Sequence, residues 1–187
     1  MDVPSLGVML LVAAGVEAHE WTYLPRNTLI SILAQLRNRF PFTVVDLADT
    51  VAETSRAVLD FCDDLVLVVG ADLPRLQAAR LFLLRLLESN FPNEKIHVLL
   101  NDTGPESKNI ETAQAGAILE FPITVRLPYD GHLVPAAINL GQPFVLSHPD
   151  KPVSRAVRDL ALKLGAGGSR PSVLAGLFKS LRPSRPA

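Results

Sequence analysis

Residues 42–49, Phe-Thr-Val-Val-Asp-Leu-Ala-Asp, are the stretch from which we derive the fold. The β-branched run at 43–45 predicts a strand that is buried on both faces, as in a parallel sheet. Asp46 would then emerge at the carboxyl edge of the sheet, where open α/β folds bind ligands. A carboxylate in that place is suited to hold Mg²⁺ through water. The alternative is that Asp46 begins a loop or caps the next helix.

Segments typical of strands alternate with segments typical of helices along the chain. The expected strands are residues 8–13, 43–47, 65–70, 96–100 and 123–127. The expected helices are residues 26–39, 52–62, 74–88, 110–117, 132–140 and 152–164. This order predicts an α/β fold with a doubly wound, mainly parallel sheet and helices on both faces. We expect one such domain over residues 1–164 and a flexible basic tail over 165–187.

Composition excludes several classes of protein. With 187 residues, 48% of them hydrophobic, the chain can bury one sizeable core. The sequence has no apolar run of the length and purity that a transmembrane helix requires, and no signal peptide is expected. The single cysteine, Cys62, is typical of a reducing, cytoplasmic compartment. A formal net charge of −1 indicates no nucleic-acid partner.

Two further strand ends carry polar residues that could meet Asp46 over one ligand. Asn101 follows the expected strand 96–100, and a polar loop runs from Arg126 to Gly131. An asparagine amide both donates and accepts hydrogen bonds, so it can bind the edge of a purine. The alternative is that Asn101 and Asp102 simply form a turn, which their residue types favour.

Three motifs resemble the MinD/ParA family of P-loop ATPases in their order and spacing. They are Val-Val-Asp at 44–46, Val-Leu-Leu-Asn at 98–101, and Leu-Pro-Tyr-Asp with Val-Pro-Ala-Ala-Ile-Asn-Leu-Gly-Gln-Pro-Phe-Val within 127–145. The chain is most similar to the pilus-assembly branch of that family, the CpaE and TadZ proteins. The resemblance covers about residues 8–164 and implies a P-loop NTPase-like fold.

The resemblance also implies a nucleotide site with ATP and Mg²⁺ as ligands. Asp46 matches the Walker B aspartate that positions the metal and its waters, and Asp49 lies in the segment that matches the nucleotide-sensing switch. In that segment the family has proline or glycine after the aspartate, whereas this chain has Leu47-Ala48. Asn101 matches the asparagine at the adenine. The residues that would lie along the base are Pro128, Tyr129 and Asp130.

The phosphate loop of the family has no counterpart in the sequence. Residues 12–20, Val-Ala-Ala-Gly-Val-Glu-Ala-His-Glu, contain one glycine, no lysine and two acids, and would repel phosphate. Since electrostatic stabilisation of the transferred phosphoryl group is most of the catalysis, we expect no independent ATP hydrolysis. A truncated family member and a degenerate, non-hydrolysing one are both compatible with this sequence.

The family resemblance implies an assembly or positioning role, in pilus biogenesis for the branch named above. A homodimer, or a partner protein of a secretion or pilus machine, is the implied partner. Chromosome partitioning, division-site placement and flagellar placement remain alternatives within the family. A receiver domain with Asp46 as phospho-acceptor is a further alternative, but it needs a clustered acidic pair, and residues 14–20 offer only Glu17 and Glu20.

Residues 172–182 have the pattern of a basic amphipathic helix that lies in a membrane interface. Its apolar stripe comprises Val173, Leu174, Leu177, Phe178 and Leu181. Lys179 and Arg182 flank the stripe, so an anionic surface is the expected partner and the periphery of the inner membrane the expected location. The alternative is that the stripe packs on the protein's own surface or stays disordered.

We therefore expect the full chain to sediment with anionic liposomes, and a chain that ends at Gly165 to sediment much less. Phe178→Glu should lower the partition coefficient about tenfold or more, because burying a phenylalanine contributes about 1.5–3 kcal/mol. Equal sedimentation of the full and shortened chains would contradict the membrane role of the tail.

Overall fold

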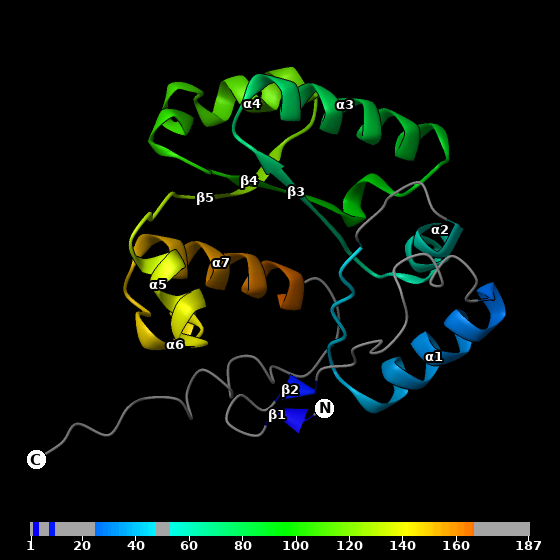
Figure 1. Ribbon diagram of the computed structural model, residues 1–187. Helices are drawn as coiled ribbons and strands as arrows, with labels where there is room; N and C mark the ends of the chain where they lie inside the picture. The colour runs from blue at the N-terminus through cyan, green and yellow to red at the C-terminus, as the bar shows by residue number, and fades with distance from the viewer. Residues whose placement is uncertain (1, 4–7, 10–24, 48–52, 167–187) are drawn as a thin grey trace, which may run out of the picture. The chain divides into compact units, whose positions relative to one another are not determined.

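The computed structural model describes residues 2–3, 8–9, 25–47 and 53–166 (Figure 1). The chain divides into two compact units, Met1–Cys62 and Asp63–Ala187. In the described residues, the first unit contains two helices and a short pair of strands, and the second contains the parallel sheet with its covering helices. The boundary that the sequence predicts at 164/165 lies near the end of the last described helix, and it stays a prediction.

In the first unit, helix α1 (Arg26–Arg39) packs against helix α2 (Glu53–Phe61). An exposed ion pair joins the two helices, with Arg26 Nη2 2.8 Å from Asp60 Oδ2. Their apolar contact explains why both helices form where the 3.6-residue period predicts them. The buried apolar residues of this pair are Leu33, Ala57, Val58 and Leu59.

The expected strand at 43–47 is wrong. Residues 42–47 pair with no strand in the described part of the chain. Val44 is 95% exposed and Val45 40% exposed, so the run is not buried on either face. The preference of β-branched residues for strands depends on cross-strand neighbours and burial, and this segment has neither.

The expected strand at 8–13 is only partly present. Strand β2 (Val8–Met9) pairs antiparallel with β1 (Asp2–Val3), with Asp2 opposite Met9. The antiparallel partner differs from the parallel sheet that the sequence predicts for this segment. Residues 10–13 lie outside the described residues.

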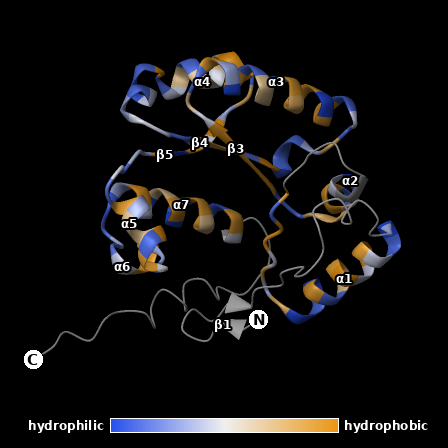
Figure 2. Ribbon diagram, in the orientation of Figure 1, coloured by the Kyte–Doolittle hydropathy of each residue, from blue (hydrophilic) through white to orange (hydrophobic). Residues whose placement is uncertain are grey.

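The second unit contains a parallel three-stranded sheet in the order β3 (Leu65–Gly70), β4 (Ile96–Asn101) and β5 (Ile123–Leu127). This confirms the predicted α/β class with parallel strands, and the strand limits agree with the sequence within one residue. Figure 2 shows the hydrophobic colouring of β3, but this strand is only partly covered, since Val69 is buried and Val68 is 57% exposed. The central strand β4 is the buried one, as a parallel strand covered on both faces requires. Within β4, the buried residues are Ile96, Val98, Leu99 and Leu100.

Helices cover both faces of this sheet (Figure 1). Helix α3 (Leu73–Glu88) connects β3 to β4, and α4 (Thr112–Leu119) connects β4 to β5 on the same face. Two right-handed crossovers that step in the same direction place their helices on one face. The later chain therefore covers the other face, as α5 (Leu133–Leu140) and α6 (Phe144–Ser147) lead into α7 (Pro152–Ala166), which packs on β5.

A β-bulge interrupts the pairing of β4 with β5. The register shifts between Val98 and Leu99, which leaves Thr124 as an extra residue in β5. The Thr124 hydroxyl accepts a hydrogen bond from the Val98 N–H at 3.1 Å, and its carbonyl accepts one from Lys163 Nζ at 2.7 Å. Both contacts satisfy polar groups that the bulge removes from the ladder, and the second fixes α7 to β5.

The expected helices agree with the structure within two residues at either end. The helix expected at 110–117 lies two residues later, because the 3₁₀ turn Pro105–Asn109 precedes it and the Glu111 N–H donates to Gln114 Oε1 at 3.0 Å. Helix α6 and the 3₁₀ turn Asn93–Lys95 were not expected. Within the described ranges, the structure has no helix that is both long and apolar enough to span a membrane.

Leu100→Ala should lower the free energy of unfolding by about 2–5 kcal/mol, since Leu100 is fully buried in the central strand and its truncation leaves a cavity. Leu81→Ala is the matched control, because Leu81 is 58% exposed on α3, and it should change stability by less than about 0.5 kcal/mol. Urea unfolding measures both. Similar losses from the two variants would contradict the assigned core.

Candidate functional site

The carboxyl edge of the three-stranded sheet brings three loops together. Gly70, Asn101 and Leu127 are aligned at the ends of their strands. Two backbone bonds continue the ladder beyond them: Ala71 N donates to the Asn101 carbonyl at 3.1 Å, and Asp102 N donates to the Leu127 carbonyl at 3.0 Å. The loops that follow β4 and β5 are thereby held side by side, at the edge where open α/β folds bind ligands.

Asn101 is the last residue of β4 and carries a polar side chain at this edge. It is half-buried, and among the described residues its amide has no hydrogen-bond partner. The Asn101 carbonyl accepts a hydrogen bond from the Ala71 N–H, and the N–H of the next residue, Asp102, donates to the Leu127 carbonyl. The backbone at Asn101 is therefore held on both sides. A fixed amide with an unused donor and acceptor fits the edge of a purine base.

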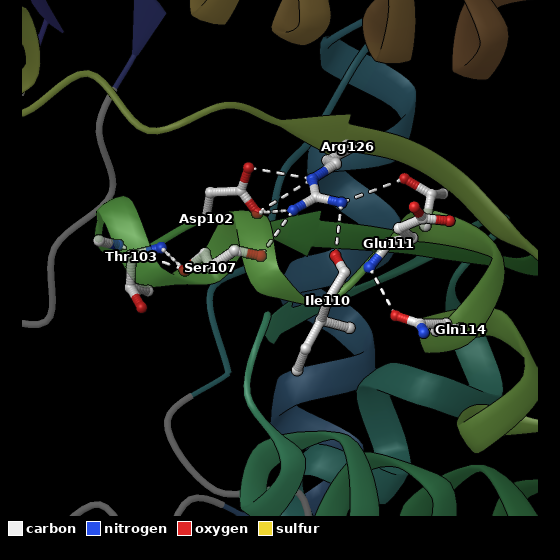
Figure 3. A network of polar contacts seen from close by, with 9 residues as sticks. Asp102, Thr103, Ser107, Ile110, Glu111, Gln114 and Arg126 are labelled. Carbon is white, nitrogen blue, oxygen red and sulfur yellow. Dashed lines mark hydrogen bonds and ion pairs between the residues drawn. The ribbon is translucent and has the colours of Figure 1, made fainter.

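Asp102 does not form the simple turn that was the alternative at this position. Its carboxylate is only 6% exposed and forms an ion pair with the 23% exposed Arg126 side chain (Figure 3). Arg126 Nε lies 3.1 and 3.0 Å from the two carboxylate oxygens, and Nη2 lies 2.9 Å from Oδ1. Planar guanidinium and carboxylate groups match in this geometry, which makes the contact strong and directional.

The remaining Arg126 donors shape the loop after β4. Nη1 donates to the Ile110 carbonyl and Nη2 to the Ser107 carbonyl, both at 2.9 Å. The buried Ser107 hydroxyl in turn accepts from the N–H groups of Thr103 and Gly104, at 3.1 and 3.4 Å (Figure 3). The sequence prediction placed Arg126 at the start of a polar loop and missed this network. The available signal was a charged residue inside an apolar strand, which needs a partner.

Asp130 stabilises the start of α5 from two residues before His132, which occupies the N-cap position. Its Oδ1 accepts hydrogen bonds from the N–H groups of Leu133 at 2.8 Å and His132 at 3.3 Å. The Leu133 N–H is the main reason that the pKa of this carboxyl lies below its ordinary value of 3.8. The predicted nucleotide-binding residue therefore already has a structural role, which orients the turn after β5.

Pro128 and Tyr129 lie in the same turn, directly after β5. Tyr129 is 44% exposed, and its ring folds back over Gly131. A Cβ at position 131 would lie 2.2 Å from the Tyr129 hydroxyl oxygen, so only glycine permits this close approach. The segment after β5 thus carries an exposed aromatic ring that lies against Gly131.

A charged pair at the start of α3 completes the edge and was not predicted. Asp72 caps the helix by accepting from the Arg75 N–H at 3.0 Å, and it forms an ion pair with Arg75 Nη1 at 2.8 Å. Arg75 Nη1 also donates to the Thr103 hydroxyl at 3.3 Å, which links α3 to the loop after β4. The Arg75 side chain lies against Gly70, where a Cβ would clash with it.

The other predicted site residues lie in the first unit or outside the described residues. Asp46 belongs to the first unit and is exposed outside any strand, so its predicted place at a strand end is wrong. Its contact with Mg²⁺ stays a prediction. The described residues contain no group of three or more histidine, cysteine, aspartate or glutamate side chains that could hold a metal ion. Asp49 and the tail residues 173–182 lie outside the described residues.

Comparison with known sequences gives a distant relative and no family model that matches the chain. An uncharacterized ATP-binding protein of Methanocaldococcus jannaschii is 22% identical over 156 residues. The match covers 83% of this chain and 58% of that protein. At this identity the match indicates a relationship without assigning an activity.

Solved structures share the fold. A ParA family ATPase from Chlorobium tepidum aligns with a TM-score of 0.69 at 21% identity, covering 79% of this chain and 61% of that one. The MinD cell division protein of Aquifex aeolicus aligns with 0.65 at 20%, covering 79% and 63%. The cell division ATPase MinD of Pyrococcus furiosus aligns with 0.66 at 17%, covering 82% and 64%. The chain has the α/β fold of these ATPases and spans less than two thirds of their length.

The contact of Asp130 with the start of α5 predicts a dependence on pH. A lowered pKa means that the carboxylate contributes to stability above the pKa of the unfolded state, and that this contribution is lost as pH falls through the lower folded value. The Leu133 amide resonance should therefore titrate with a midpoint below 3.8, and the titration should disappear in Asp130→Asn. A midpoint at or above 3.8, measured by NMR, would contradict this contact.

Proposed function

We propose that this chain is a MinD/ParA-like protein that binds adenine nucleotide at the carboxyl edge of its sheet and acts by assembly and positioning. The observation that carries the proposal is the half-buried Asn101 amide, which has no partner among the described residues and lies at the ligand-binding edge of this fold. The similar protein of M. jannaschii is itself described as ATP-binding. Both facts support a nucleotide ligand.

The base would lie between Asn101 and the turn of Pro128 and Tyr129. Asn101 would bind the purine edge with its amide, and the exposed Tyr129 ring would offer apolar surface beside it. Asp130 would act through the backbone, since its carboxylate accepts the Leu133 N–H at the start of α5. The described residues therefore fit a nucleobase at this edge.

Fewer residues of the chain could bind the phosphates and the metal ion of a nucleotide. Asp46 would hold Mg²⁺ through water, and Asp49 would belong to a segment that responds to the nucleotide. Residues 12–20 offer no lysine and few glycines to surround phosphate. We therefore propose binding without independent hydrolysis, because a phosphate cradle supplies most of the stabilisation in phosphoryl transfer.

The cellular role that we propose is in pilus biogenesis, as in the CpaE and TadZ proteins that the 127–145 motif resembles. The chain would work as a homodimer or with a partner of the pilus machine. It would contact the inner membrane through the basic tail, with Phe178 in the apolar stripe. A solved MinD from A. aeolicus forms a complex with MinC, which supports regulated assembly with a partner as the mode of action.

Division-site placement is the second candidate, because three of the similar structures are described as cell division proteins. Chromosome partitioning and flagellar placement rest on the same fold. A fluorescent fusion separates these roles: localisation to the pilus base favours the first proposal, and localisation to midcell or the nucleoid favours the alternatives.

ATP should bind the purified chain, and Asn101→Ala should weaken binding about 30-fold, since two hydrogen bonds of about 1 kcal/mol each are lost. Asn109→Ala is the matched control, because Asn109 is an exposed residue of the 3₁₀ turn after β4. Titration calorimetry measures affinity, and phosphate release should stay at background. Equal affinities of the two variants, or turnover that Asp46→Asn abolishes, would refute this proposal.

A further inference from the structure

We propose that Asp102 and Arg126 are positioning residues for base recognition. Their buried ion pair holds the Asn101 amide and the turn at Pro128 at a fixed spacing, and thereby sets a preference for adenine over guanine. This inference rests on the proposed nucleotide binding and extends it to two residues that would not touch the ligand.

The positions of the pair in the chain explain how it would act. Asp102 directly follows Asn101, and Arg126 lies two residues before Pro128. Three contacts of 2.9–3.1 Å join the guanidinium to the carboxylate. The Asp102 N–H also donates to the Leu127 carbonyl at 3.0 Å. Asp102 is therefore bound to β5 through both its backbone and its side chain, and it directly follows Asn101, the residue proposed to bind the base.

Burial makes this connection rigid. The Asp102 side chain is 6% exposed and that of Arg126 23% exposed, so water competes little for the contact. Arg126 also donates to the carbonyls of Ser107 and Ile110 at 2.9 Å each. The guanidinium cannot move without breaking several charge-assisted hydrogen bonds at once, and the loop after Asn101 is fixed to it (Figure 3).

The rigidity has a chemical consequence for the choice of base. Adenine presents a donor and an acceptor side by side, and an asparagine amide matches both when it is held in the plane of the base. Guanine presents an acceptor in place of that donor. If the Asn101 amide could rotate freely, its paired hydrogen bonds to adenine would be lost. The stacking and apolar contacts of the site with either base would remain.

The test compares ATP and GTP affinities of the full chain with those of Arg126→Met, Asp102→Asn and Arg126→Lys. The wild type should prefer ATP. Arg126→Met and Asp102→Asn should lose about tenfold or more in ATP affinity and little in GTP affinity. Arg126→Lys should retain part of the preference, because it keeps the charge and loses the planar fork. Glu120→Gln is the control, since it removes a more exposed ion pair with Arg80 and should change neither affinity.

Affinities are compared by calorimetry at a temperature where circular dichroism shows each variant to be folded. A variant that does not fold is replaced by Arg126→Lys, the mildest of the three. An unchanged ratio of ATP to GTP affinity in the folded variants, or equal losses for both nucleotides, would overturn the inference and leave the proposed function intact. Failure of the wild type to bind ATP would overturn the proposed function and this inference with it.

Discussion

A guanidinium group in the interior of the second unit has to be neutralised and hydrogen-bonded, and much of the carboxyl edge is arranged around that requirement. Removing one partner of a buried ion pair costs about 3–5 kcal/mol, because an uncompensated charge is left behind. Arg126 meets the requirement through Asp102 and through the Ser107 and Ile110 carbonyls. The loop after β4 is consequently held to Arg126 through its Ser107 and Ile110 carbonyls, while Thr103, Glu106 and Lys108 stay exposed.

The same edge shows how the sheet and its surroundings depend on one another. The strands end at one level because their parallel register aligns Gly70, Asn101 and Leu127. Helix α3 follows β3 and is capped by Asp72. Arg75, in the first turn of this helix, donates to the Thr103 hydroxyl in the loop after β4. Side-chain contacts thus join the start of α3 and strand β5 to the loop after β4. A preorganised edge of this kind loses little conformational entropy on binding.

The described part of the carboxyl edge offers few groups that could bind phosphate or a metal ion. Two cations described at this edge are already paired, Arg75 with Asp72 and Arg126 with Asp102. Asp46, which the family resemblance assigns to Mg²⁺, is an exposed residue of the other unit. Recognition of a base is therefore better supported by the described residues than recognition of phosphate. This imbalance is the reason that we propose binding and assembly rather than turnover as the role of the chain.

Sequence alone determined the α/β class, the limits of β3, β4 and β5 within one residue, and the place of Asn101 at a strand end. Those features depend on local periodicity, capping and apolar runs, which neighbouring residues encode. Tertiary structure decided that residues 43–47 form no strand, since a strand needs a partner that the segment itself does not specify. It also decided the ion pair between Asp102 and Arg126, 24 residues apart, and the contact of Lys163 with the Thr124 bulge, 39 residues apart. Which distant groups meet follows from strand register and helix packing, and no local pattern contains that information.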